Sequence, residues 1–558
     1  MAKIQTAFLI MICWCWPLWV ASAQVLPPQA AVATAHPLAT AVGHEVLAQG
    51  GNAFDAAVAI SAVLAVVEPY SSGIGGGGFY LLYRADTAQY GFIDARETAP
   101  SAATEKMYLD KQGNLVPETS VNGPLAAGIP GIPAALEYLT QHYAKLSLAH
   151  NLKPAMQLAK KGFPVDEYYR RMVQFRLLAL QQSPAAAKQF LDQHKIPALG
   201  YRLKQSDLAR TLALIAEHGK AGFYEGVLAQ KLIKGVKEAG GIWQSQDLAQ
   251  YHVILRTPLI GQYQNIRLIT APPPSSGGVA LLTLFNILSP LNLNELNTTD
   301  RNHMLVEAMR RVYRDRAAYL GDPDFVKIPV EQLIHPFYAA GLAAGIHPHK
   351  ATPSELLPGV KSPPQGTDTT HFSILDRQGN RVAATLSINL PFGAAFVPPG
   401  TGVLLNNEMD DFVAKAGTPN SYGLVGATAN AIAPGKRPLS SMSPTFVEGP
   451  QGIGILGTPG GSRIITMVAL GILSYAAGEK PAVWVAKPRF HHQYLPDIIQ
   501  HEAQTFDAQT TLQLQNNGHS LQLQERPYGN MQAILWDLHQ NQVHAASDPR
   551  GIGSATVK

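Results

Sequence analysis

A proline-rich stretch of the chain leads directly into a pair of threonines, Thr369 and Thr370. Five prolines within residues 343–368 disfavour regular structure, which predicts an exposed, mobile linker that ends at this pair. If the chain were cut before Thr369, that residue would present a hydroxyl and a free α-amine together. An α-amine has a pKa near ~7.7 to 8.0 and can act as the base for its own hydroxyl. The junction is therefore a candidate nucleophile, although β-propensity alone also places threonines at the start of a strand.

Two other motifs resemble binding sites, but the residues around them argue against that function. Gly73, Gly75 and Gly78 fit a G-x-G-x-x-G pattern. The pattern follows a helix that a proline ends and leads into a strand, which is the reverse of a dinucleotide site. The neighbours His491 and His492 would point to opposite faces of a strand, and no third ligand lies at a suitable spacing. We therefore expect neither a metal nor a cofactor.

The hydrophobic pattern predicts the elements that would hold Thr369. Residues 370–375 and 381–390 are two β-rich runs joined across 376–380, which predicts a hairpin. In the first half of the chain, alternation and run length predict a buried, Ala-rich helix up to Pro69, a strand at 79–83, and mostly helical structure from about 130 to 340. Near the C-terminus they predict a strand at 452–457, followed by a helix that Ser462 caps and Gly478 ends.

Length and composition limit the possible folds and partners. A chain of 558 residues exceeds what one simple core supports, so we expect two domains or one large layered domain. A hydrophobic content of 46% with only 15% charged residues is typical of a compact globular enzyme. The net charge of +4 is weak and no run of Lys and Arg occurs, so we expect no nucleic-acid partner.

The N-terminal segment has the layout of an export signal. Lys3 precedes an apolar stretch that ends near Val20, and small residues follow up to Ala23. An uncleaved membrane anchor is the alternative, but the stretch is shorter than the ~18 to 20 residues of a spanning helix and Pro17 interrupts it. We expect cleavage after Ala23, a periplasmic or secreted protein, and no stable membrane insertion afterwards. Both cysteines lie inside the signal, so the exported chain has no thiol or disulfide.

Ten blocks of this sequence, in order from near residue 50 almost to the C-terminus, resemble the γ-glutamyltransferase family of N-terminal-nucleophile hydrolases. The blocks are GGNAFDAAVA (50–59), EPYSSGIGGGGF (68–79), DARETAP (94–100), PPPSSGG (272–278), TTHFSILD (369–376), LLNNEMDDF (404–412), GKRPLSSMSPT (435–445), GTPGGSRIIT (457–466), PRFHHQ (488–493) and ASDPR (546–550).

The resemblance implies an α+β fold with four layers, αββα, in which two packed sheets lie between layers of helices. It also implies a precursor that cuts itself between Asp368 and Thr369. The Thr369 hydroxyl attacks the carbonyl of that bond to give an ester, which water then hydrolyses. Signal removal and this cut would leave a large chain, 24–368, that ends in the linker, and a small catalytic chain, 369–558, paired as a heterodimer.

The resemblance assigns the bond chemistry to neutral groups. Thr369 is the nucleophile, and Gly460 and Gly461 match the positions whose N–H groups stabilise the oxyanion. The glycines precede Ser462 at an expected helix N-terminus, where unpaired N–H groups and the helix dipole favour negative charge. The family usually has a second hydroxyl as threonine in a T-x-N context, where this chain has Ser387. We expect the hydrogen bond of that hydroxyl to Thr369 to survive, with less rigid positioning.

The resemblance assigns substrate recognition to charged and polar groups that hold the α-amino acid end of a γ-glutamyl donor. A guanidinium suits its carboxylate, and carboxylates suit its ammonium. The matching carboxylate binders are Arg96, Ser440 and Ser441, and the matching ammonium binders are Asn389, Glu408 and Asp411. Asp410 is expected to serve loop structure.

The stretch after Phe412 resembles the family's lid loop, with Tyr422 at the position of the covering aromatic residue. A lid favours small donors such as glutathione over polymeric ones. The group would pass to water, to amino acids or to peptides. One alternative is a related glutaryl- or cephalosporin-type amidase, which would not need both Glu408 and Asp411. Another is a secreted binding protein that no longer cuts itself.

Overall fold

The computed structural model describes residues 25–357, 369–414, 421, 424 and 426–558. The expected export signal, Asp368 and Tyr422 lie outside these ranges. No helix within the described ranges combines the length and apolarity needed to cross a membrane.

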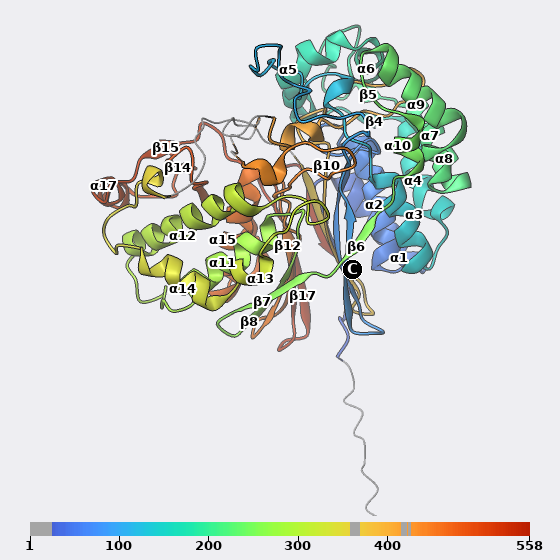
Figure 1. Ribbon diagram of the computed structural model, residues 1–558. Coiled ribbons are helices and arrows are strands. Elements are labelled where there is room, and N and C mark those ends of the chain that lie inside the picture. Colours follow the sequence, from blue (N-terminus) through green and yellow to red (C-terminus); the bar gives the residue numbers. More distant parts are fainter. Residues whose placement is uncertain (1–24, 358–368, 415–420, 422–423, 425) are drawn as a thin grey trace, which may run out of the picture.

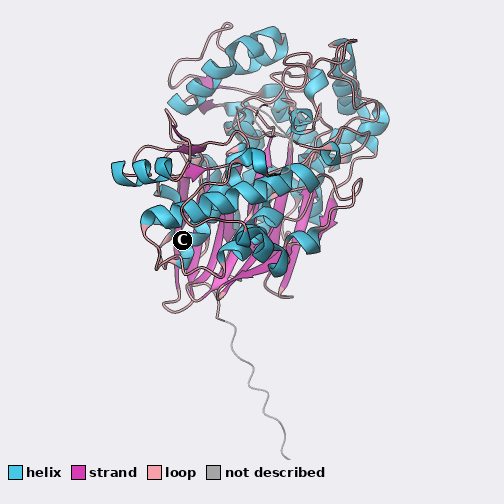
Figure 2. Cartoon of the chain, turned by 60° about the vertical axis from the view of Figure 1, so that its left-hand side comes forward, coloured by secondary structure: helices cyan, strands magenta, loops and turns pink. Residues whose placement is uncertain are grey.

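Two antiparallel sheets form the centre of the molecule (Figures 1 and 2). The first has the order β18-β1-β9-β10-β2-β3-β6, with bounds Ser554–Val557, Ala31–Thr34, Thr370–Leu375, Arg381–Ser387, Gly77–Arg84, Gln89–Ala95 and Ile254–Arg256. The second has the order β17-β16-β12-β11-β8-β7, with bounds Gln542–Ser547, Gln532–Asp537, Gly452–Gly457, Thr445–Gly449, Ile266–Thr270 and Leu259–Tyr263. Short strands outside these sheets are β4 and β5 (Phe163–Pro164, Arg202–Leu203) and β13 to β15 (Phe490–His491, Ile499–His501, Leu521–Leu523).

Side chains of the first sheet alternate between two cores. In β2, Phe79 and Leu81 pack in the core shared with the second sheet, whereas Tyr80 and Leu82 pack against helices on the other side. All four side chains are fully buried. The middle of this sheet therefore has no solvent face, and each of its faces must be covered there by another layer.

Helices cover the outer face of each sheet (Figure 1). Beside the first sheet lie α1 to α10: Pro37–Ala48, Ala53–Val67, Ile132–His142, Leu148–Lys161, Glu167–Gln182, Pro184–Phe190, Ser206–His218, Ala221–Tyr224, Gly226–Glu238 and Ser245–Ala249. Beside the second lie α11 to α17: Gly277–Leu288, Thr298–Tyr319, Val330–Leu333, Pro336–Ala344, Ile464–Ala476, Pro481–Ala486 and Ala508–Asn516. The predicted four-layer αββα architecture is confirmed.

The Ala-rich helix α2 is buried along its whole length, as its sequence predicts. Small side chains let neighbouring elements approach it closely. A capping box between Asn52 and Asp55 satisfies its first N–H groups. The helix ends at Val67, and Pro69 follows closely. Glu68, its C-cap residue, therefore has a fixed position behind the start of β9.

The predicted hairpin lies in the middle of the first sheet, as β9 and β10. Leu386 pairs with Thr370, so Ser387, the next residue, lies beside Thr369. The sequence predicted that the second strand would end at Leu390. It ends at Ser387 instead, because Asn389 has the left-handed φ of +73°. The hairpin therefore brings the two candidate hydroxyls together at the end of the sheet.

The described part of the predicted linker begins at the end of α14 and contains one short 3₁₀ turn, Ser354–Leu356, and it is held in place. The Thr352 N–H donates to Glu307 Oε1 at 3.1 Å, and the Ser354 N–H donates to Asp497 Oδ2 at 2.7 Å. Residues 345–357 are therefore not the free linker that the prolines predict, because carboxylates on α12 and beyond β13 accept their backbone hydrogen bonds.

Candidate active site

Thr369 lies immediately before β9 and lines a small pocket. Its neighbour Thr370 donates from Oγ1 to Glu68 Oε2 at 2.6 Å, which ties the start of the strand to the end of α2. Thr369 itself is only 5% exposed. The pocket brings together most of the residues that the resemblance named: Arg96, Thr369, Ser387, Asn389, Asp411, Ser440, Ser441 and Gly461, with Arg316, Leu424, Met442 and Ile464.

Gly460 and Gly461 form the turn that leads to the N-terminus of α15. Their φ angles are +142° and +56°, and a Cβ at Gly460 would lie 2.5 Å from Met467 Cε, so the turn requires glycine. A short 3₁₀ turn, Gly461–Arg463, precedes α15. The prediction that Ser462 caps the helix was wrong, because its hydroxyl donates to Gln493 Oε1 at 2.7 Å and the helix begins at Ile464.

Arg96 joins the two acids that were expected to bind an ammonium. Its Nη1 lies 2.7 Å from Glu408 Oε2, and its Nη2 pairs with Asp411. The side chain is 1% exposed and also donates from Nε to the Pro438 carbonyl at 3.2 Å. Arg96 therefore links the acidic turn to the loop that carries Ser440, and it already has carboxylate partners without a ligand.

Burial sets the protonation of these acids. It raises the pKa of Glu408 to about 7 and that of Asp411 to about 7, although the Arg96 charge opposes both shifts. Glu97, whose carboxylate lies 3.7 Å from Arg96 Nη1, has its pKa raised by burial to about 8. Three carboxyl groups thus surround one guanidinium. The sequence analysis gave a role to Arg96 and none to its neighbour Glu97.

The loop of Ser440 and Ser441 is held by two elements of the second helical layer. The Ser440 carbonyl accepts from both the N–H and the hydroxyl of Ser276, each at 2.7 Å. Arg316 Nη2 donates to Ser441 Oγ at 3.3 Å. Sequence analysis missed Arg316, because a charge-rich helix is typical of an exposed face and α12 carries its charges in the interior.

Asn389 and the adjacent histidines His491 and His492 are hydrogen-bonded within the protein. Asn389 Nδ2 donates to the Asn407 carbonyl at 2.9 Å, and its N–H donates to Ser387 Oγ at 2.7 Å. His491 contacts Thr466 Oγ1 at 2.9 Å, and His492 contacts Asp497 at 3.1 Å. Within the described ranges, no three His, Cys, Asp or Glu residues are grouped as metal ligands.

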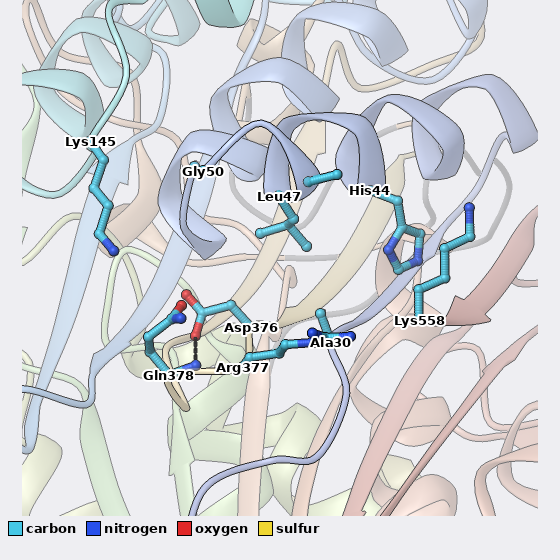
Figure 3. Close-up of a pocket in the computed structure, with 11 residues that line it drawn as sticks. Ala30, His44, Leu47, Gly50, Lys145, Asp376, Arg377, Gln378 and Lys558 are labelled. Atoms are coloured by element: carbon cyan, nitrogen blue, oxygen red, sulfur yellow. Dashed lines mark hydrogen bonds between the residues drawn. The ribbon is translucent and has the colours of Figure 1, made fainter.

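A larger cavity lies away from these residues. It has a volume of about 380 Å³ and is lined by the turn after β9 and by the end of α1. Figure 3 shows Lys145, His44, Lys558 and Asp376 among the residues that line it, with the Asp376 carboxylate beside Gln378. That carboxylate already accepts N–H groups from Ala53, Gln378 and Asn380, so it serves the turn. The pocket of Thr369 is much smaller, with a volume of about 20 Å³, and two of its lining residues, Arg96 and Asp411, are paired with each other.

A comparison with known families identifies the fold and its chemistry together. The family model for γ-glutamyltranspeptidase matches residues 39–557. The chain belongs to this family. It is 43% identical to the glutathione hydrolase proenzyme of Pseudomonas sp. strain A14, over 93% of this chain and 92% of that protein. It is 40% identical to the glutathione hydrolase proenzyme of Escherichia coli strain K12, over 95% of this chain and 92% of that protein. The chain is therefore an enzyme of the γ-glutamyltranspeptidase family.

A solved structure extends the likeness to a second activity. The cephalosporin acylase of Bacillus halodurans superposes with a TM-score of 0.83 and 27% identity, over 98% of this chain and 99% of that one. This γ-glutamyltranspeptidase family member thus shares its fold with an amidase. The fold alone therefore does not separate the two activities.

Proposed function

We propose that the protein is an exported precursor that cuts itself before Thr369 and then transfers γ-glutamyl groups. The observation that carries this proposal is the pocket in which Thr369 lies beside Arg96, Asp411 and Ser440. A potential N-terminal nucleophile is thereby combined with groups for both ends of an α-amino acid. The signal would be residues 1–23, the large chain 24–368 and the small chain 369–558, paired as a heterodimer.

In this mechanism the freed α-amine of Thr369 takes the hydroxyl proton as the oxygen attacks the γ-carbonyl carbon. Negative charge develops on the carbonyl oxygen, and the N–H groups of Gly460 and Gly461 stabilise it. Collapse breaks the amide bond, and the leaving amine takes the proton. The γ-glutamyl group is then an ester on Thr369, which water or the amine of an amino acid or peptide attacks.

Recognition of the donor separates this proposal from the amidase alternative. A γ-glutamyl donor carries an ammonium that a glutaryl donor lacks, and an ammonium needs anionic or carbonyl partners when it is buried. Glu408 and Asp411 supply two carboxyl groups beside Arg96. A glutaryl amidase gains nothing from a buried acid pair, so the pair favours γ-glutamyl donors such as glutathione.

The direct test is incubation of the purified protein with glutathione, with and without glycylglycine, followed by quantification of glutamate and γ-glutamyl-dipeptide. The proposal predicts glutamate alone in the first mixture and both products in the second. A matched reaction with glutarylglycine should be much slower. Faster release of glutarate than of glutamate would establish the amidase activity in its place.

A denaturing gel of the same preparation tests maturation. The proposal predicts two chains, of roughly 345 and 190 residues by subtraction from the expected cleavage sites, with Thr369 first in the smaller. A single full-length chain would support the secreted binding protein that no longer cuts itself. Fractionation of the host cell, with the small chain followed by antibody, tests export.

A further inference from the structure

Arg316 is a buried cation at the edge of the pocket that no assignment so far explains. It lies in the last turn of α12, is 5% exposed, and lines the pocket together with Thr369. Its Nε donates to Ser276 Oγ at 3.0 Å and its Nη2 to Ser441 Oγ at 3.3 Å. Both partners are neutral hydroxyls.

The neighbouring arginines on the same helix form ion pairs with carboxylates. Arg310 and Arg311 pair with Glu307, and Arg314 pairs with Asp315. No ion pair within 4.0 Å joins Arg316 to a carboxylate anywhere in the described part of the chain. The direct partners of this buried guanidinium are two hydroxyls, which replace its hydration only in part, and the Asp411 carboxyl group acts on its charge only from beyond 4.0 Å. Burial accordingly lowers the pKa of Arg316 to about 10.

Arg96, the other guanidinium of the pocket, has direct carboxylate partners. It contacts Glu408 and Asp411 directly, and Glu97 lies 3.7 Å away. A donor carboxylate that approached Arg96 alone would compete with three protein carboxyl groups for one cation. The same carboxylate approaching Ser441 would meet a guanidinium that has no direct carboxylate contact, on which Asp411 acts only from a greater distance.

We propose that Arg316, through its own charge and through Ser441, is a determinant of recognition of the donor α-carboxylate, and shares that task with Arg96. This inference rests on the proposed γ-glutamyl transfer. It divides the α-amino acid end of the donor between two places: the ammonium joins the acids around Arg96, and the carboxylate lies between Arg96 and the Arg316–Ser441 pair. Arg316 acts in binding and has no part in bond cleavage.

The test compares two chromogenic donors in the Arg316→Gln variant: γ-glutamyl-p-nitroanilide and 4-aminobutanoyl-p-nitroanilide, which lacks only the α-carboxylate. We expect KM for the first donor to rise at least about tenfold while kcat/KM for the second changes less than about threefold. Arg314→Gln, which removes a neighbouring arginine that does not line the pocket, should leave the preference between the donors unchanged.

Equal effects of Arg316→Gln on the two donors, or no effect on either, would overturn the inference while leaving the proposed function intact. A parent enzyme that cleaves neither γ-glutamyl-p-nitroanilide nor glutathione would overturn both. Self-cleavage and the melting temperature report folding of each variant. If Arg316→Gln does not fold, Arg316→Lys provides the test, because it keeps the charge and should retain the preference for the carboxylate-bearing donor. Loss of that preference in a folded Lys variant would contradict the inference.

Discussion

The two ends of the Thr369 pocket are built from different kinds of groups. At one end Arg96, Glu408 and Asp411 are ionisable and in direct contact with one another; Arg96 and Glu408 are buried and Asp411 is partly buried. At the other end Thr369, Ser387 and Gly461 are neutral, and they lie where the first sheet meets the start of α15. The two ends meet at the hydrogen bond between the side chains of Ser387 and Glu408. One end can discriminate between donors by charge, whereas the other can only perform the same attack on any carbonyl that reaches it.

This difference teaches that recognition and bond chemistry are separable in this fold. In the proposed mechanism, self-cleavage uses the neutral end, because its carbonyl belongs to the chain itself and needs no α-amino acid recognition. In the same mechanism, turnover of a donor uses both ends. Substitutions at the charged end should therefore change donor kinetics alone, and substitutions at the neutral end should change self-cleavage and turnover together.

The largest effect is expected from Thr369→Ala, which removes the attacking oxygen from both reactions. The variant should accumulate as one uncleaved chain without transfer activity, as measured on a denaturing gel and by release of glutamate from glutathione. Thr369→Ser keeps the hydroxyl but loses the methyl that restricts its rotamer, so it should process and turn over slowly. Normal glutathione hydrolysis by separately expressed 24–368 and 369–558 chains carrying Ala at position 369 would refute the assignment of the nucleophile.

Arg96→Ala should break the charged end alone. An uncompensated carboxylate in a closed pocket costs on the order of 2 to 5 kcal/mol, which is at least about 30-fold in kcat/KM for γ-glutamyl donors. Self-cleavage should persist and also serves as the folding control, since removal of Arg96 leaves Glu408 and Asp411 without their guanidinium. Donor kinetics within about threefold of the parent would exclude a substrate role for Arg96.

A smaller effect is expected from pH. The pKa values of Glu408 and Asp411 are raised to about 7, so both are largely ionised above that pH and protonated below it. Only the ionised forms attract the donor ammonium. The ratio of kcat/KM for γ-glutamyl-p-nitroanilide to that for glutaryl-p-nitroanilide should therefore fall as pH falls through about 7. The α-amine of Thr369 acts on both donors, so its titration cancels in this ratio.

Glu408→Gln supplies the control for that pH dependence. The amide does not ionise, so the ratio should be lower at high pH and should depend on pH less steeply than in the parent. A ratio that is independent of pH in the parent would show that the buried acids do not recognise the ammonium.

The smallest effect is expected from Ser387→Thr, at the neutral end. The hydroxyl stays beside Thr369, and the added methyl restricts its rotamer, so self-cleavage and turnover should change together by less than about threefold. Ser387→Ala removes the hydroxyl and should slow both. Half-times of self-cleavage, measured on freshly refolded precursor, give the comparison. A variant that alters donor kinetics but leaves self-cleavage unchanged would place Ser387 at the charged end.

Much of the fold was predictable, because its elements have strong local signals. The hairpin of β9 and β10, the buried helix α2 and the strand β12 follow from alternation, alanine content and an apolar run. The four-layer arrangement came from the resemblance, since periodicity alone does not reveal which sheets pack together. The predicted capping role of Ser462 was wrong, because a hydroxyl before a helix can hydrogen-bond another segment, here the side chain of Gln493.

The site was predictable only in part, for a physical reason. Motif matches name residues, but they do not show that Arg96 is already paired with Glu408 and Asp411, or that Arg316 is not paired with an acid. Those states depend on contacts between segments far apart in the chain. The irregular segment 345–357 was misjudged for the same reason, because its partner Glu307 lies on a distant helix.

The central claim, that Thr369 carries the γ-glutamyl group, is tested most directly by mass spectrometry of the small chain. The enzyme would be mixed with a γ-glutamyl donor, quenched in acid within one turnover, and digested. We expect the peptide that begins with Thr369 to gain the mass of one γ-glutamyl group, and the gain to disappear when glycylglycine is added before the quench. Turnover with the modification on another residue, or with none, would contradict the account.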